Sequence, residues 1–303
     1  MIIVNLKGRL GNQLFQWAAA RYLADASKSE IVLYSGERDR KAGRTPPLMG
    51  FPLPTRVAQP KDFRKVFFPF GKFSKQLQQV SLHVRAFKTR QILSLDELEA
   101  ARRSPSKNYF LNGYFMSSHI ADAIRKTLQQ DLNLLDFTPS RYPYLDIVDH
   151  PRAVALHIRR GDFATGPARQ SYGLCSVEYY LRSLQTLEDK IGPAKPVVFS
   201  DDISWCEDVL AHLPNVAFFK APTDGRDFED MMLMSRCAHQ IIANSTYSWW
   251  AAYLNKNPEK QVFAPYPWRA TKEHQNQYFL PENWQRVAKY ASSVSPTPML
   301  QST

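Results

Sequence analysis

Two neighbouring arginines at the end of an apolar run have the chemistry to bind phosphate. The run Ala153–Ile158 is followed at once by Arg159, Arg160, Gly161 and Asp162. In an open α/β sheet, ligands bind beyond the carboxyl ends of the strands. Guanidinium groups offer fixed, forked donors and keep their charge, which suits phosphate. The alternative is a structural Arg–Asp pair, because Asp162 can orient an arginine as well as accept a proton.

A second polar run, Asn244-Ser-Thr-Tyr-Ser-Trp-Trp250, lies between an apolar run and an expected helix. A helix N-terminus presents unpaired N–H groups and the positive end of the dipole to an anion. The hydroxyls of Ser245 and Thr246 would add donors there, next to Asn244. The two hydroxyl residues are also good helix caps, and capping is compatible with phosphate binding.

An acidic helix start and a single histidine are candidates for contacts to a nucleoside. Asp230 precedes a Met/Leu run that is expected to be core, and its carboxylate would suit the N1–H and amino group of guanine. The alternative is an acidic first turn that complements the helix dipole. His157 stands alone near a strand end without metal-ligand spacing, so a base or ribose contact is the functional alternative.

The loop Gly8-Arg-Leu-Gly-Asn-Gln13 lies between an expected strand and an expected helix. It lacks the third glycine of the dinucleotide fingerprint. Asn12 and Gln13 are expected to be either helix caps or substrate contacts. The sequence contains no Walker A motif and no pair of aspartates two residues apart. The pair Asp201-Asp202 could mimic such a metal motif, but a helix cap is favoured.

The elements that must position these residues form two patterns. Residues 2–6 and 31–34 predict strands that flank a helix reaching about Ser27, residues 36–60 predict a loop, and residues 61–136 predict mostly helices. From residue 151 onward strands and helices alternate, which predicts βαβ units around a parallel sheet. The predicted strands of this part are 153–158, 196–200, 216–219, 240–243 and 261–264, and the predicted helices are 176–190, 202–212, 226–238 and 246–256.

The charge of the chain is concentrated in one segment. The 303 residues carry a net charge of +11, and residues 38–103 contain 15 Lys and Arg against 5 Asp and Glu. Such a segment suits a nucleic acid or an anionic membrane surface with a lipid-linked substrate, or it is a solvated surface without a partner. Three isolated cysteines, no signal peptide and no membrane-spanning run together favour a cytosolic protein.

The motifs at residues 8–13, 157–162, 199–202, 244–250 and 280–284, taken in order, resemble bacterial α-1,2-fucosyltransferases of glycosyltransferase family 11. The resemblance covers about residues 1–290. It implies a GT-B-like α/β fold, with two facing Rossmann-like domains and a cleft between them. Residues 1–150 would be the acceptor-side domain and residues 151–290 the domain that binds the GDP-sugar. Residues 291–303 are rich in Ser, Pro and Thr, which predicts a disordered tail.

The resemblance also implies the reaction, which is transfer of L-fucose from GDP-β-L-fucose to the 2-OH of a terminal β-galactose, with inversion. Arg159 would hold the β-phosphate, His157 and Asp230 would contact guanosine, and the remaining donor-binding candidates are Arg160, Asn244, Ser245 and Thr246. Arg9 and Asn12 would reach across the cleft toward the pyrophosphate and the fucose. The candidate general base is Asp162. No metal or other cofactor is expected, because the metal motif of many sugar transferases is missing.

The expected acceptor is a β-galactoside oligosaccharide, either free or linked to a lipid. The other expected partner is an anionic inner membrane surface, which residues 38–103 would contact. This corresponds to a cytoplasmic enzyme of bacterial surface polysaccharide synthesis. Three other interpretations stay open: a GDP-sugar transferase of another linkage or sugar, a GDP-sugar-binding module without turnover, and a non-enzymatic nucleic-acid-binding protein. Only the last leaves the arginine and Asn-Ser-Thr motifs without a role.

Overall fold

The computed structural model of the protein describes residues 1–36, 44–66, 89–104, 108–132, 144–165, 168–220, 226–270 and 279–290. The chain divides into two compact units, Met1–Leu134 and Leu135–Thr303. Each unit contains a parallel β-sheet with helices, which confirms the prediction of two Rossmann-like α/β units. The predicted disordered tail, 291–303, lies outside the described residues.

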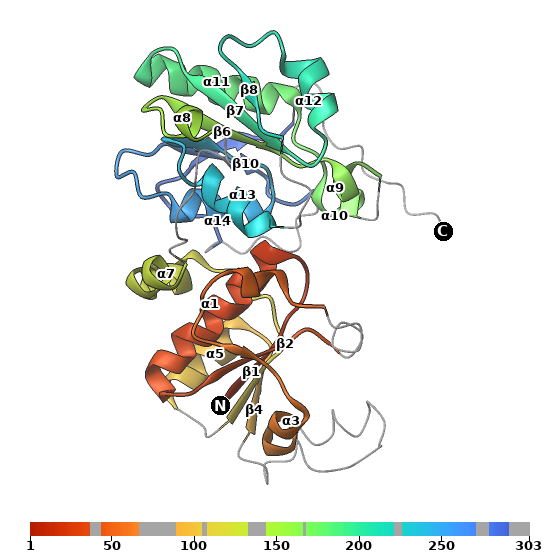
Figure 1. Ribbon diagram of the computed structural model, residues 1–303, viewed down its shortest axis with the longest axis vertical. Coiled ribbons are helices and arrows are strands. Elements are labelled where there is room, and N and C mark those ends of the chain that lie inside the picture. Colours follow the sequence, from red (N-terminus) through yellow and green to blue (C-terminus); the bar gives the residue numbers. More distant parts are fainter. Residues whose placement is uncertain are drawn as a thin grey trace. The chain divides into compact units, whose positions relative to one another are not determined.

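The first unit is built on a five-stranded sheet of the order β3-β2-β1-β5-β4, in which every described pair is parallel. The predicted strands and first helix are confirmed as β1 (Ile2–Asn5), α1 (Leu10–Ser27) and β2 (Ile31–Tyr34). The apolar side chains of β1 and β2 are fully buried. Figure 1 shows α1 and α5 on one side of these strands and α3 on the other.

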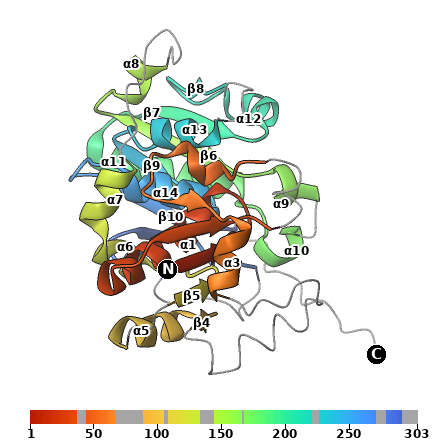
Figure 2. The ribbon, with the colours of Figure 1, turned by 60° about the horizontal axis from the view of Figure 1, so that its bottom comes forward.

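The middle of the first unit differs from the prediction. The stretch expected to be mostly helical contributes two strands, β4 (Thr89–Ile92) and β5 (Asn108–Leu111), which lie side by side in Figure 2. The expected loop 36–60 contains a short 3-10 helix and strand β3. The other elements of this unit are η1 (Pro47–Gly50), β3 (Arg56–Val57), α3 (Pro60–Val66), α5 (Leu95–Arg103), α6 (Ser118–Ala123) and α7 (Arg125–Asp131).

The second unit is built on a six-stranded parallel sheet of the order β11-β10-β9-β6-β7-β8. All predicted strands and helices of this part are confirmed within a few residues, and the structure adds β11 and two short helices, α9 and α10. The strands are β6 (Ala153–Ile158), β7 (Lys195–Ser200), β8 (Ala217–Phe218), β9 (His239–Ile241), β10 (Val262–Tyr266) and β11 (Gln285–Ala288). The helices are α8 (Leu145–Val148), α9 (Gly161–Thr165), α10 (Ala168–Tyr172), α11 (Val177–Ile191), α12 (Ile203–Leu210), α13 (Asp227–Met234) and α14 (Thr246–Leu254).

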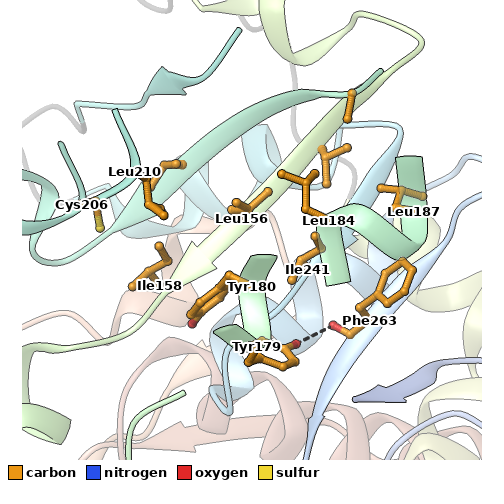
Figure 3. Close-up of a cluster of buried hydrophobic side chains, with 13 residues drawn as sticks. Leu156, Ile158, Tyr179, Tyr180, Leu184, Leu187, Cys206, Leu210, Ile241 and Phe263 are labelled. Atoms are coloured by element: carbon orange, nitrogen blue, oxygen red, sulfur yellow. Dashed lines mark hydrogen bonds between the residues drawn. The ribbon is translucent and has the colours of Figure 1, made fainter. Parts of the chain in front are cut away.

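The core on one face of this sheet consists of side chains from α11 and α12 packed on β6, β7, β9 and β10 (Figure 3). Tyr179 belongs to this core, and its hydroxyl is 2.7 Å from Ile242 O and 3.0 Å from Phe263 O. A hydroxyl has a single proton, so the two carbonyls share one donor. Figure 1 shows α13 and α14 on the other side of β6 and β7 from α12.

The first unit ends earlier than the predicted boundary at residue 150. Helix α8 contacts β6, β7 and α13, and the side chains of Leu145 and Val148 are buried. This helix therefore belongs to the core of the second unit, which begins before its first strand. None of the helices in the described part of the chain is long and apolar enough to cross a membrane.

Candidate functional site

Three strand ends of the second unit converge on one edge of the sheet. Strands β9, β6 and β7 are neighbours, and parallel strands end at the same edge. The sequence after β6 carries the two arginines, that after β7 carries Asp201 and Asp202, and that after β9 carries Asn244 and Ser245. The predicted donor-binding residues of these segments are thus brought to a common edge.

Arg159 is held between two carboxylates. Its Nη2 lies 2.6 Å from Asp162 Oδ1 and its Nη1 lies 2.7 Å from Asp201 Oδ2, and its side chain is 15% exposed. Asp201 Oδ1 also accepts a hydrogen bond of 2.8 Å from the backbone N–H of Arg160. A Cβ at Gly161 would overlap the Asp201 carboxylate, so a larger residue there would require that side chain to shift. The Arg–Asp pair expected as the alternative is present, and the two carboxylates engage part of the guanidinium's five N–H donors.

Arg160 contacts helix α12. Its Nε lies 2.9 Å from Asp202 Oδ2, and its guanidinium lies 3.8 Å from the centre of the Trp205 ring. Asp202 in turn accepts a hydrogen bond from the backbone N–H of Trp205, which confirms the helix cap expected for this pair of aspartates. Among the described residues, no group of three or more His, Cys, Asp and Glu is arranged to hold a metal ion.

His157 is a buried neutral imidazole with an unsatisfied atom. The residue is 6% exposed, and its Nδ1 is buried without a hydrogen-bond partner. Burial, with a contribution from the charge of Arg159, lowers the pKa of His157 to about 3. An unpaired buried polar atom costs stability, on the order of 1–3 kcal/mol. A ligand hydrogen bond to Nδ1 would recover that loss, which supports the predicted contact to a nucleoside.

Tyr247 joins the histidine to the acidic helix α13, and the sequence analysis did not select it. Its ring lies 5.7 Å from the His157 ring, and its hydroxyl donates a 2.6 Å hydrogen bond to Asp227 O in the first turn of α13. Burial raises the Tyr247 pKa well above 10, and the carboxylates of Asp230 and Asp227 add to this. His157 and Asp230 thus flank one tyrosine. Its place within the polar run 244–250 was the signal available in the sequence.

The side chain of Asn244 is buried inside the second unit. It is 2% exposed, and its Nδ2 donates to Tyr172 O at 2.9 Å, Gly173 O at 3.0 Å and Trp268 O at 3.1 Å. Its Oδ1 accepts a 3.5 Å hydrogen bond from the Cys175 thiol. These contacts make Asn244 a positioning residue that ties three loops together.

Ser245 is the N-cap of α14, and Thr246 is the first residue of that helix. The Ser245 hydroxyl accepts a 3.3 Å hydrogen bond from the backbone N–H of Tyr247. The capping role is therefore confirmed. A helix N-terminus capped in this way is suited to an anion, because the positive end of the helix dipole lies there.

The Gly8–Gln13 loop of the first unit is braced by side-chain amides. Gln13 donates a 3.1 Å hydrogen bond to Gly8 O, and Gln16 both donates to Lys7 O at 3.2 Å and accepts from Lys7 N at 2.9 Å. These hydrogen bonds give Gln13 a structural role in the loop. Arg9 is the exposed N-cap residue of α1, and Asn12 lies in the first turn of this helix. Gly8, which precedes the cap, has a φ of +72°.

Residues beside this loop at the same sheet edge escaped the sequence analysis. Lys7 Nζ donates to Asn112 O at 3.1 Å, and Asn5 Nδ2 donates to Asn112 Oδ1 at 2.8 Å, so the ends of β1 and β5 are joined. Tyr114, two residues further on, is 45% exposed. These residues were missed because the β5 region was expected to be helical.

The exposed large apolar side chains of the described residues, three in the first unit and one in the second, occupy the same kind of position in their sheets. All four lie at or just beyond the carboxyl end of a parallel strand, where ligands of open α/β sheets bind. They are Val57 in β3, Leu93 after β4, Tyr114 after β5 and Tyr266 in β10.

The basic segment lies partly outside the described residues, which omit 37–43 and 67–88. Of its described arginines, Arg56 pairs with Asp62 at 2.6 Å and with Glu30 at 2.7 Å. Arg102 lies 3.9 Å from the centre of the Tyr22 ring and donates to the Tyr22 carbonyl. These arginines are engaged within the first unit.

Comparison with known proteins gives a family match. Residues 58–288 match the model described as Glycosyl transferase family 11. The O-antigen biosynthesis glycosyltransferase WbnK of Escherichia coli is 29% identical over 88% of this chain and 94% of its own. An alpha-1,2-colitosyltransferase of Escherichia coli is 35% identical over 48% of this chain and 50% of its own. The galactoside 2-alpha-L-fucosyltransferase Sec1 of Mus musculus is 32% identical over 33% of this chain and 28% of its own.

Solved structures are matched over most of the chain at low identity. The NodZ alpha-1,6-fucosyltransferase soaked with GDP-fucose is 13% identical with a TM-score of 0.47, over 84% of this chain and 91% of that one. An Arabidopsis thaliana FUT1 mutant in complex with GDP is 12% identical with a TM-score of 0.47, over 88% and 71%.

Proposed function

The chain belongs to glycosyltransferase family 11, and we propose that it transfers L-fucose from GDP-β-L-fucose to the 2-OH of a terminal β-galactose with inversion at the anomeric carbon. The names of its relatives support this proposal, because they include α-1,2-colitosyl and galactoside α-1,2-fucosyl transferases. The relative matched over nearly its whole length acts in O-antigen biosynthesis, which supports a role in building a bacterial surface polysaccharide.

The observation that carries the proposal is the shared edge of β6 and β9. It presents Arg159, prepositioned by two carboxylates, and the capped N-terminus of α14. A guanidinium and a helix N-terminus are both strong anion ligands. Arg159, Ser245 and Thr246 would bind the diphosphate of GDP-fucose, while His157, Asp230 and Tyr247 would line the guanosine end.

The reaction requires stabilisation of the charge that develops on GDP as the bond to fucose breaks. Electrostatic stabilisation by preorganised donors is usually the largest contribution to catalysis. Arg159 and the α14 N-terminus supply it in this proposal, with Arg9 and Asn12 acting on the pyrophosphate and fucose. Asp201 and Asp202 are bonded to Arg159, Arg160 and α12, which supports a metal-independent mechanism.

Asp162 has two candidate roles in the transfer: general base for the attacking hydroxyl, or orienting partner of Arg159. Its 2.6 Å pair with Arg159 favours the orienting role. The Asp162→Asn variant separates the two. Loss of a general base lowers kcat by about 10²–10⁴-fold and removes the acidic limb of the pH–rate profile. Loss of an orienting partner weakens GDP binding and leaves that limb in place.

One comparison supports a second candidate for the donor sugar. The relative named as a colitosyltransferase shows that a related enzyme of this family uses another sugar. A panel of GDP-sugars, with NMR of the product to establish the linkage, distinguishes the two donors.

We also propose that the enzyme is cytoplasmic and that the basic segment 38–103 holds it peripherally at an anionic membrane, where a lipid-linked acceptor would be met. Flotation with anionic liposomes tests this contact. Salt-sensitive binding supports it, and equal recovery with neutral liposomes contradicts it. Salt-dependent binding to RNA in the absence of liposome binding would favour the nucleic-acid alternative.

The first experiment measures GDP release from GDP-fucose with lactose or N-acetyllactosamine as acceptor, with and without EDTA. Acceptor-dependent release that survives EDTA supports a metal-independent fucosyltransferase. Binding of GDP-fucose without release supports the donor and contradicts these acceptors. If GDP-fucose does not bind, the assignments of Arg159, Ser245 and Thr246 are wrong.

A further inference from the structure

Lys289 is a buried lysine that follows β11. The residue is 0% exposed, and its ammonium donates to Tyr172 O at 2.5 Å and to Trp268 O at 3.4 Å. Among the described residues, none of the ion pairs with Asp or Glu includes it. A buried charge is normally paired, because moving it out of water is costly. Lys289 is thus solvated by backbone carbonyls and the face of one aromatic ring, without a carboxylate among these contacts.

Hydrogen bonds link Lys289 to the sheet edge that carries the proposed donor-binding residues. The carbonyls of Tyr172 and Trp268 that accept from its ammonium also accept from Asn244 Nδ2. Asn244 immediately precedes Ser245, the N-cap of α14. The ammonium is therefore one shared carbonyl away from the residue that leads into the proposed diphosphate site.

The surroundings of Lys289 contain other titratable and charged groups. The Tyr290 ring centre lies 4.9 Å from Nζ, and the Cys175 thiol donates to Asn244. Arg182 of α11 donates to Ala288 O and Tyr290 O, and Arg269 lies over the Tyr172 ring. Burial lowers the Lys289 pKa to about 8, and interaction with Cys175 opposes this in part. Neither arginine offers a counter-charge.

We propose that Lys289 is a positioning residue of the donor site whose missing counter-charge is supplied by the diphosphate bound at the N-terminus of α14. This inference rests on the proposed function. It assigns to Lys289 two effects: its hydrogen bonds hold the 172 and 268 loops against Asn244, and its charge attracts the diphosphate through the low-dielectric interior.

The charge effect has a consequence for proton binding. If protonated Lys289 strengthens GDP binding about tenfold, linkage requires that GDP raise the Lys289 pKa by about one unit. Starting from a pKa of about 8, the protein would then take up about half a proton on binding GDP near pH 8.5. Guanosine carries no phosphate and should cause no uptake.

The test is isothermal titration calorimetry of the full chain with GDP and with guanosine at pH 8.5, in two buffers of different ionisation enthalpy. Wild-type protein should take up protons with GDP and none with guanosine. Lys289→Arg should bind GDP without proton uptake. Lys289→Met should weaken GDP binding about tenfold at pH 7 and leave guanosine binding unchanged. The matched control is Lys190→Met, because Lys190 is an exposed lysine of the same unit.

The outcomes separate a failure of the Lys289 proposal from a failure of the proposed function. Equal GDP affinity in wild type and Lys289→Met, or no proton uptake by wild type, overturns the proposal. Equal weakening of GDP and guanosine binding also overturns the charge effect and leaves a purely structural lysine. If wild-type protein binds neither ligand, the proposed function itself is wrong. The wild-type proton measurement decides the case if Lys289→Met does not fold.

Discussion

The two units each place a loop after a central strand, but they stabilise these loops by different means. In the first unit, neutral amides of Gln13 and Gln16 hold the loop after β1 through its backbone. In the second unit, the loop after β6 is held by ion pairs of Arg159 with Asp162 and Asp201. An amide brace keeps its shape whatever the charge state of its surroundings. An ion-paired loop responds to the charge that a ligand brings.

The largest effect is expected from removing the arginine of the ion-paired loop. Arg159→Ala removes the guanidinium that faces the proposed diphosphate, and loss of one such contact lowers the rate by about 10²–10³-fold. Assay of GDP release measures this. Arg236→Ala is the matched control, because Arg236 forms a surface ion pair with Asp149 in the same unit. Equal activity of the two variants would remove Arg159 from the phosphate site.

A smaller effect is expected from replacing Asp201, one of the two carboxylates that pair with Arg159. Asp201→Asn loses the ion pair with Arg159 and should lower stability by about 1–3 kcal/mol. Gln16→Leu should cost a similar amount in the first unit. Urea unfolding at about 0.05 M and about 1 M salt tests the difference between the loops. The Asp201→Asn deficit should shrink at high salt and the Gln16→Leu deficit should not, so equal salt responses would contradict the comparison.

The smallest effect concerns the histidine beside the ion-paired loop. Burial holds the pKa of His157 at about 3 in the folded protein, against about 6.5 in an unfolded chain. Between these values only the unfolded state binds the proton, so stability falls as the pH falls below about 6.5. The slope is up to about 1.4 kcal/mol per pH unit. Urea unfolding of wild type and His157→Gln from pH 7 to 5 measures it. Parallel curves would show that His157 does not titrate in this way.

The sequence predicts the second unit better than the first, for physical reasons. Strand β6 is apolar except for His157, and all six of its residues are buried. Strand β4 is mostly polar and strand β11 is half polar, so neither an apolar run nor a clean alternation of apolar and polar residues marks them. Strand β5 is only four residues long, and the asparagines that begin it and follow it, Asn108 and Asn112, resemble a loop.

The candidate site also contains residues that the sequence predicts and residues that it does not. Residues at strand ends, such as Arg159 and Ser245, were predictable because a strand that ends in polar residues marks the ligand edge. Their partners were not predictable from spacing. Asn244 bonds to the Tyr172 carbonyl, 72 positions away in the chain, and the sheet order alone brings them together. Tyr247 was overlooked because its contacts to His157 and to α13 depend on residues far away in the chain.

The close approach of Gly161 and Asp201 restricts how the arginine loop can change over evolution. A side chain at 161 would push on the Asp201 carboxylate, and moving that carboxylate would disturb its ion pair with Arg159. The two positions are therefore coupled, although 40 positions separate them. A mutagenesis library that varies both positions together samples combinations that a library of the loop alone would miss.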